Sequence, residues 1–243
     1  MNQPPSASIL RVDRSATGEE IIARLKIDLP PAVIVITGGA GKMSPQNTRR
    51  VAQLVRNGVA QAASRAHAAV VDGGTRSGVM QMMGEALAAV GRTAPLIGVA
   101  PAGKISLPGG HPPDDDHWRL EPNHSHFVLV EGDKFGDETD IMYRVAQTLA
   151  ARAPSIAVLV NGGEIAAQEV AWNVHHGREV VTLAGSGRLA DELANAVRGG
   201  LSPANKLIAE IVRRGRLTIF DIARSAAELE ELLLTQLKAR SPG

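Results

Sequence analysis

Residues 70–80 read Val70-Val71-Asp72-Gly73-Gly74-Thr75-Arg76-Ser77-Gly78-Val79-Met80. A short β-branched run ends here in two glycines and hydroxyl residues, and an apolar helical pattern follows. A strand that turns through Gly-Gly into a helix leaves backbone N–H groups uncovered at the helix N-terminus, where an anion such as a phosphate binds. The alternative is a tight turn with nothing bound, because glycine turns are common between strands and helices.

The same pattern recurs along the chain. Three further glycine turns follow apolar runs: Gly38-Gly39 after residues 33–36, Gly162-Gly163 after 156–160, and Gly185-Ser186-Gly187 after 179–183. Strands that alternate with helices predict an α/β fold, with a Rossmann-like, doubly wound and mainly parallel sheet and helices on both faces. The carboxyl ends of parallel strands lie along one edge, where ligands bind at the reversal of strand order. The four turns are therefore predicted to line one crevice.

The domain organisation is expected to be simple. Residues 1–29 are predicted to form an N-terminal tail and a short helix near 17–25, and residues 30–243 a single domain that opens at Pro30-Pro31. A small β insertion is expected near 123–131. Further strands are predicted at 68–71, 96–99 and 217–220.

The composition excludes several classes of function. The formal net charge is +1 and only 2% of the residues are aromatic, which gives no electrostatic or stacking argument for nucleic acid. The chain has no cysteine, which excludes disulfides, thiolate metal sites and a cysteine nucleophile. No basic-then-apolar leader and no apolar run near the ~20 residues that span a bilayer are present. We expect a cytoplasmic protein that binds neither nucleic acid nor membrane, and a dimer or larger homo-oligomer is possible.

Two nucleotide-binding fingerprints match only in part. The segment 38–43 carries Lys42, but the spacing of a P-loop fails and Met43 stands where the hydroxyl residue belongs. The segment 185–190 matches G-x-G-x-x-A after a strand, but no acidic residue ends a following strand about 20 residues further on. These matches favour neither a P-loop nucleotidase nor a dinucleotide-dependent dehydrogenase.

Charged residues beside two of the turns are candidates for chemistry. Arg188 can pair with a phosphate through its guanidinium, or it forms a surface ion pair with Asp191 or Glu192. Glu164 and Glu169 follow the third turn. Either can act as an acid or base if a sugar of the ligand lies over this turn. Otherwise they are solvated or capping carboxylates.

Histidines gather between residues 111 and 126. His124 and His126 would share one face of a strand, and His111, His117 and the run Asp114–Asp116 lie nearby. An H-x-H pair lacks a third ligand at a defined spacing. We therefore favour hydrogen-bonded structural or ligand-contacting histidines over a metal site.

Four motifs, in this order, resemble the SLOG domain family. They are residues 73–80 (GGTRSGVM), 123–130 (NHSHFVLV), 161–163 (NGG) and 185–191 (GSGRLAD). The version that they resemble is the domain at the N-terminus of melastatin-type TRP channels. The resemblance implies a stand-alone prokaryotic, Rossmann-like domain that binds a nucleotide-derived ligand such as ADP-ribose for sensing or signalling, with no obligatory cofactor and no metal.

The wider superfamily includes the LOG phosphoribohydrolases, which cleave the N-glycosidic bond of nucleoside monophosphates, and this activity is the alternative. Their motif P-G-G-x-G-T-x-x-E falls on residues 161–169, where Gly162-Gly163 and Glu169 match. Asparagine replaces the proline, Ile165-Ala166 replaces the Gly-Thr pair, and no counterpart of the family's catalytic arginine is found. Glu169 is the implied catalytic candidate. The expected ligand-binding residues are Thr37, Gly38, Gly39, Gly73, Gly74, Thr75, Ser77, Gly78, Val79, Met80, Asn123, His124, Ser125, His126, Gly162, Gly163, Glu164, Gly185, Ser186, Gly187 and Arg188.

Overall fold

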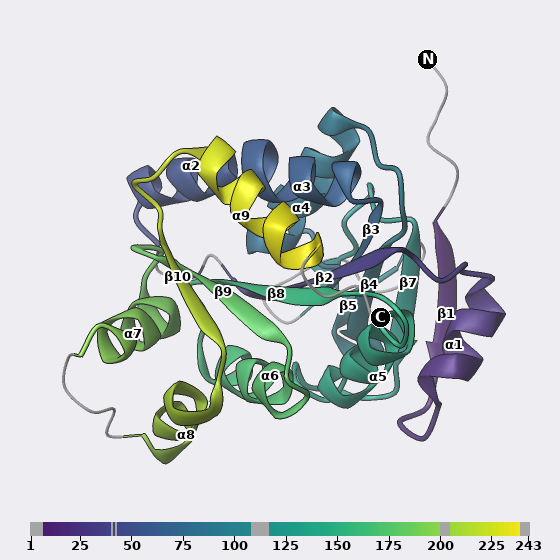
Figure 1. Ribbon diagram of the computed structural model, residues 1–243. Helices are drawn as coiled ribbons and strands as arrows, with labels where there is room; N and C mark the ends of the chain where they lie inside the picture. The colour runs from purple at the N-terminus through teal and green to yellow at the C-terminus, as the bar shows by residue number, and fades with distance from the viewer. Residues whose placement is uncertain (1–6, 40, 42, 108–116, 200–204, 239–243) are drawn as a thin grey trace.

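The computed structural model describes residues 7–39, 41, 43–107, 117–199 and 205–238. Within them an eight-stranded sheet runs through the molecule, and every pairing in it is parallel (Figure 1). The strands, in spatial order, are β1 (Ser8–Val12), β7 (His126–Val130), β4 (Leu96–Pro101), β3 (Ala68–Asp72), β2 (Ala32–Gly38), β8 (Ser155–Val160), β9 (Glu179–Ala184) and β10 (Leu217–Asp221). The predicted Rossmann-like α/β fold is confirmed.

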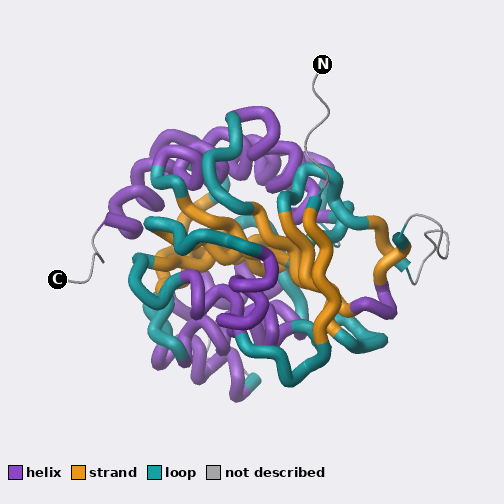
Figure 2. The backbone as a smooth tube through the Cα atoms, turned by 90° about the vertical axis from the view of Figure 1, so that its right-hand side faces the viewer, coloured by secondary structure: helices purple, strands orange, loops and turns teal. Residues whose placement is uncertain are grey.

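Helices cover both faces of this sheet (Figures 1 and 2). One face carries α2 (Pro45–Leu54), the π-helical turn η1 (Val55–Val59), α3 (Ala60–Arg65), α4 (Gly78–Val90) and α9 (Ala226–Lys238). The other face carries α1 (Gly18–Leu25), α5 (Thr139–Leu149), α6 (Glu164–His175), α7 (Arg188–Val197) and α8 (Lys206–Arg214). Because both faces are buried, the central strands are mostly apolar, as parallel sheets require, and polar residues such as Thr37 and Asp72 stand at their carboxyl ends.

The order of the strands reverses between β2 and β8. From β2 the chain builds β3, β4 and β7 on one side, and it then crosses back through α5 to place β8 on the other side. In open α/β sheets such a switch point opens a crevice at the carboxyl ends of the strands. Gly38 ends β2 at this point with φ +115°, and a Cβ atom there would collide with the carbonyl oxygen of Val160. Only glycine lets the two strand ends approach so closely.

The structure differs from the sequence prediction at the edge beyond β4. The prediction of a small β insertion near residues 123–131 is wrong, because residues 126–130 form β7, a full member of the main sheet. A separate two-stranded sheet exists elsewhere: β5 (Ile105–Ser106), after the short turn η2 (Ala102–Lys104), pairs with β6 (Trp118–Arg119). β1, for which no strand is predicted, pairs along all of β7, while the short helix expected near 17–25 is confirmed as α1. β1 is missed because the run SILRV is short, is interrupted by Arg11 and has mostly exposed side chains, so it lacks the continuous apolar run of the central strands.

Candidate functional site

A cavity of about 480 Å³ lies at the switch point, among the carboxyl ends of β2, β3 and β8. This volume is within the usual range of ligand pockets, roughly 300–1,000 Å³. Its lining consists of Ile36, Gly38, Gly39, Gly73, Thr75, Met80, Phe135, Glu138, Gly162, Gly163, Glu164, Ile165, Ala166, Glu169 and Arg188.

Three of the four predicted glycine turns meet in this cavity. The turns that begin at Gly38, Gly73 and Gly162 contribute lining residues, as do Glu164, Glu169 and Arg188. Several predicted residues do not line it: Thr37, Gly74, Ser77, Gly78, Val79, Asn123, His124, Ser125, His126, Gly185, Ser186 and Gly187. Of the candidates in the histidine-rich segment, His111 and Asp114–Asp116 lie outside the described residues, as does Lys42.

The cavity contains a helix N-terminus and a cationic side chain next to each other. The first N–H groups of α6 have no intrahelical partner, and no side chain caps the helix at Gly163. The guanidinium of Arg188 lies against Gly163, where a Cβ atom would collide with Nη2. Arg188 is exposed and adopts a left-handed backbone, φ 49°, which is uncommon for a non-glycine residue and occurs often at functional sites. Within the described residues it forms no ion pair with Asp191 or Glu192.

The fourth turn has a different role, because its helix N-terminus is already occupied. The backbone N–H of Ala190 donates to the carbonyl of Asn161 at 3.0 Å. The hydroxyl of Ser186 accepts the Asn161 N–H at 2.8 Å and donates to the Leu183 carbonyl at 2.6 Å. The turn at residues 185–187 therefore holds the loop after β8 and presents Arg188 to the cavity.

The cavity is also lined by two carboxyl groups with perturbed pKa values. Glu169, half-buried on the inner face of α6, has its pKa raised to about 8 by burial first and then by the charge of Glu138, although a hydrogen bond with Thr37 opposes the shift. Burial raises the pKa of Glu138 to about 7, against hydrogen bonds that include the Gly136 N–H at 2.7 Å. Burial therefore favours the protonated form of both carboxyls near neutral pH, most strongly for Glu169.

A network of buried hydrogen bonds holds the part of α6 that carries Glu169. Buried Thr37 contacts the hydroxyl of Tyr143 at 3.1 Å, and Asn173 donates to the same hydroxyl at 3.0 Å. Asn173 also donates to the backbone carbonyl of Glu169 at 2.9 Å. Burial, followed by the charge of Glu169, raises the pKa of Tyr143, so its phenol stays neutral. Thr37 thus does not line the cavity itself, but it contacts both Tyr143 and Glu169.

His124 lies in a buried ionic cluster next to the cavity. Its Nε2 is 2.9 Å from Asp72 and its Nδ1 is 2.8 Å from Glu121, and all three side chains are at most 1% exposed. Burial alone would lower the pKa of His124, but the charge and hydrogen bond of Asp72, helped by Glu121, raise it to about 9. Asp72 in turn accepts the Gly74 N–H at 2.7 Å. The imidazolium thus fixes the glycine turn after β3.

The neighbours of His124 tie strands together. Ser125 exchanges hydrogen bonds with the backbone of Leu96, and half-buried His126 contacts the Ser125 hydroxyl at 2.8 Å. In the part of the chain that is described, no group of three or more His, Asp or Glu residues has the arrangement of a metal site. Ligand contact by residues 123–126 stays a prediction.

Glu138, Phe135 and Ile165 are lining residues that the sequence analysis does not single out. Glu138 precedes α5 in a charged loop and resembles an ordinary solvent-exposed residue, yet it is 7% exposed. The only local signal is the spacing of Glu138 from the end of β7, which places it near the carboxyl edge of the sheet. For Phe135 and Ile165 the sequence signal is their apolar character, because each stands in a segment where solvated side chains are expected.

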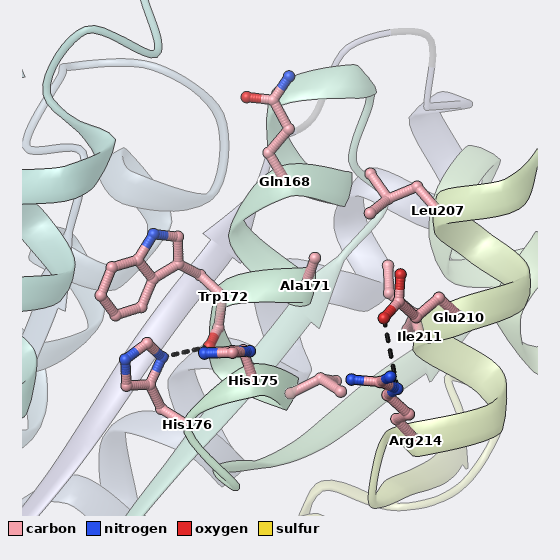
Figure 3. A pocket seen from close by; sticks show the side chains of 10 residues that line it. Gln168, Ala171, Trp172, His175, His176, Leu207, Glu210, Ile211 and Arg214 are labelled. Atoms are coloured by element: carbon pink, nitrogen blue, oxygen red, sulfur yellow. Dashed lines mark hydrogen bonds and ion pairs between the residues drawn. The ribbon is translucent and has the colours of Figure 1, made fainter.

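A second cavity, of about 560 Å³, lies on the outer side of the helical layer between α6 and α8 (Figure 3). Its wall includes Trp172, whose ring stacks on His176 and on Tyr143. An ion pair at 3.3 Å joins Glu210 and Arg214 across one turn of α8. None of the predicted site residues lines it, so the smaller cavity at the switch point is the candidate functional site.

A family model described as "SLOG in TRPM, prokaryote" matches residues 31–231. The match covers most of the chain and includes every element that lines the cavity. This chain belongs to that SLOG family. The predicted family is thereby confirmed.

The SLOG chain is also similar to parts of much longer animal proteins. It is 25% identical to mouse transient receptor potential cation channel subfamily M member 2, over 80% of this chain and 15% of the relative. The rat protein of the same name is 24% identical over the same shares, and a subfamily M member-like 2 protein of Nematostella vectensis is 28% identical over 53% of this chain and 10% of the relative. The SLOG chain therefore spans only a small fraction of these channels. No helix among its described residues is long and apolar enough to cross a membrane.

Proposed function

We propose that this SLOG protein binds a nucleotide-derived ligand, ADP-ribose-like or a nucleoside phosphate, in the cavity at the switch point, for sensing or signalling. The observation that carries the proposal is the position of the Arg188 guanidinium against Gly163, at the uncapped N-terminus of α6. A guanidinium and helix-terminal N–H groups that face one space are complementary to a phosphate.

The carboxyl groups of Glu169 and Glu138 suit the sugar of such a ligand. A carboxyl that keeps its proton donates a hydrogen bond, and an ionised carboxylate accepts one. Glu169 and Glu138, with pKa values of about 8 and 7, therefore match vicinal ribose hydroxyls, which both donate and accept. We therefore assign the phosphate to Arg188 and the N-terminus of α6, and the ribose to the two carboxyl groups, all of which line the same cavity.

Calorimetric titration with ADP-ribose, cyclic ADP-ribose, NAD and AMP tests the proposal. We expect at least one to bind, and Arg188→Ala to weaken its binding by about 10- to 100-fold, because a charge-assisted hydrogen-bond pair is lost. Arg188→Lys should recover only part of the affinity, since an ammonium lacks the bidentate geometry. Arg198→Ala, which removes an exposed arginine after the other end of α7, is the matched control. Flat heats for all four ligands with folded protein would exclude the proposal.

A second candidate function is hydrolysis of the N-glycosidic bond of a nucleoside monophosphate. The observation in its favour is that Glu169, which matches the glutamate of the LOG motif, carries a proton near neutral pH beside Glu138. A protonated carboxyl can assist departure of the base, and an ionised neighbour can stabilise the positive charge that develops on the ribose. The replacement of the motif's Gly-Thr pair by Ile165-Ala166 alters the backbone near the phosphate.

Release of free base from nucleoside monophosphates measures this activity directly. If the protein is a hydrolase, Glu169→Gln should lower kcat by about 10²- to 10⁴-fold, the usual contribution of an acid–base group, and the rate should fall as pH rises through about 8. Glu192→Gln, which replaces an exposed glutamate of α7 that does not line the cavity, should keep its rate. No base release, or equal release by Glu169→Gln, would rule the hydrolase out and leave the binding proposal standing.

A further inference from the structure

A small polar cavity lies at the amino edge of the sheet, the edge at which the strands begin. It has a volume of about 210 Å³ and is found where β8 begins and where α5 and α6 end. α6 therefore runs from the candidate site, which Glu164 lines, to this second place, which its C-terminal cap His176 lines. The lining of the amino-edge cavity consists of Gln147, Ala150, Ala153, Pro154, Ser155, His176, Gly177 and Arg178.

Arg178 places a buried positive charge in the wall of this cavity. The residue is only 3% exposed, and arginine is almost never buried to this extent unless its charge is paired. Among the described residues, no carboxylate forms an ion pair with it, and none of the lining residues is acidic. Burial lowers the pKa of Arg178, which reflects the cost of holding the charged form away from water.

Most N–H donors of this guanidinium have no partner in the described part of the chain. Nε donates to the hydroxyl of Ser155 at 3.1 Å, and Nη1 donates to the side-chain oxygen of Asn173 at 2.8 Å. A guanidinium has five N–H groups, so three of them, including both on Nη2, bond no described residue. The C-terminal ends of α5 and α6 attract a cation, but their carbonyls accept none of these side-chain donors. The unused N–H groups are therefore available to an occupant of the cavity.

A second guanidinium stands beside the cavity. Arg216, which is exposed, donates to the carbonyl of the lining residue Gly177. Glu179, the next residue in the chain after Arg178, instead accepts a hydrogen bond from Thr218 of β10 at 2.6 Å. Two guanidinium groups near a cavity without an acidic lining residue give it a positive potential, which favours an anion.

We propose that the amino-edge cavity binds a small oxyanion, a carboxylate or inorganic phosphate, through the guanidinium of Arg178. A guanidinium presents paired N–H donors that match two oxygens of such a group, and these charge-assisted hydrogen bonds are strong. The hydroxyl of Ser155 holds the guanidinium in place. The volume is below the roughly 300–1,000 Å³ of pockets for drug-sized ligands, so the site suits an ion rather than a nucleotide. The inference does not depend on the proposed function, because the two cavities share no lining residue.

A short hydrogen-bond chain leads from this site toward Glu169. Asn173 accepts from Nη1 of Arg178 at 2.8 Å and donates to the backbone carbonyl of Glu169 at 2.9 Å. Asn173 is fully buried, so its side-chain amide senses a change at Arg178 without contact with the anion. The Asn173 amide and the Nε–H of Arg178 are therefore two reporters of occupancy.

Nuclear magnetic resonance of nitrogen-15-labelled protein tests the site. Titrations with sodium acetate and with sodium phosphate, at constant ionic strength, are made on the Arg188→Ala variant so that the candidate phosphate site does not contribute. We expect at least one anion to shift the Arg178 Nε–H and Asn173 amide signals saturably. The anion that binds more tightly identifies the natural chemistry as carboxylate or phosphate.

Variants of the cavity wall are compared through the backbone amide signal of Gly177. Arg178→Gln should weaken anion binding by about 10- to 100-fold, because the charged donors are lost. Ala153→Phe should have a similar effect by filling the cavity while Arg178 stays in place, and it keeps the test valid if Arg178→Gln does not fold. Arg213→Gln, which removes an exposed arginine of α8 that lines neither cavity, is the matched control and should bind within twofold of the parent.

Two results would overturn the anion site. One is the absence of a saturable shift with either anion in folded protein, which would mean that water alone fills the cavity. The other is equal affinity of the parent and the folded Ala153→Phe variant. Neither result would affect the nucleotide proposal, because the titrations with ADP-ribose and AMP address the cavity at the other edge of the sheet.

Discussion

His124→Ala is expected to lower the free energy of unfolding at pH 7 by about 3–5 kcal/mol, the usual cost of breaking a buried ion pair. The substitution removes the imidazolium that bridges Asp72 and Glu121, which are both at most 1% exposed. Two buried carboxylates would then face each other with no imidazolium between them, and only the neutral donors of Gly74 and Asn123 would still bind them. The Gly74 turn would also loosen, because Asp72 holds its N–H. Urea unfolding followed by circular dichroism measures the change.

His126→Ala is the matched control for this substitution. His126 lies two residues further along the same segment, is only half-buried and contacts the hydroxyl of Ser125. Its replacement should cost less than about 1 kcal/mol, the net value of one ordinary hydrogen bond. Equal destabilisation by the two alanines would contradict the buried ionic cluster.

The pH dependence of stability follows from the same cluster. The folded-state pKa of His124, about 9, lies above its ordinary value of 6.5. Its contribution is therefore fully present below pH 6.5 and is lost as pH rises through 9, a change on the order of 3 kcal/mol. This loss should be absent from the His124→Ala variant.

Glu169→Gln is expected to stabilise the protein at high pH, relative to the unchanged chain. Burial and the charge of Glu138 raise the pKa of Glu169 from 4.5 to about 8. A group with a raised pKa contributes stability below its unfolded value, here pH 4.5, and loses it as pH rises through 8. Because glutamine does not titrate, the stability of the variant minus that of the unchanged protein should grow between pH 5 and pH 8.5, on the order of 3 kcal/mol after allowance for the partial exposure of Glu169.

Denaturant unfolding at a series of pH values gives this difference directly. His124 titrates over part of the same range, but it does so in both proteins and cancels in the subtraction. Glu164→Gln, an exposed residue in the first turn of α6, should show no such growth. A constant difference between Glu169→Gln and the unchanged protein would mean that Glu169 is ionised like a surface carboxyl, which would also remove the chemical argument for the hydrolase.

The local pattern of the chain is enough to predict the parallel sheet, its helices and the edge at which the glycine turns gather. Strand, turn and helix signals are short-range, and the right-handed β–α–β crossover then puts all carboxyl strand ends on one edge. This rule predicts that Gly38-Gly39 and Gly162-Gly163 lie on the same edge of the sheet. It also predicts that Glu169 lies close to them, as found in the cavity.

Tertiary structure decides which of these turns has free N–H groups and which charged side chains meet. The N-terminus of α7 is occupied by the carbonyl of Asn161, whereas α6 has no side-chain cap. His124 pairs with Asp72, 52 residues away, and Glu138 comes to face Glu169 from a loop after β7. β1 likewise exists as a strand because β7 offers it an edge. Such contacts depend on strand order and on the distance between segments remote in sequence, so no local pattern encodes them.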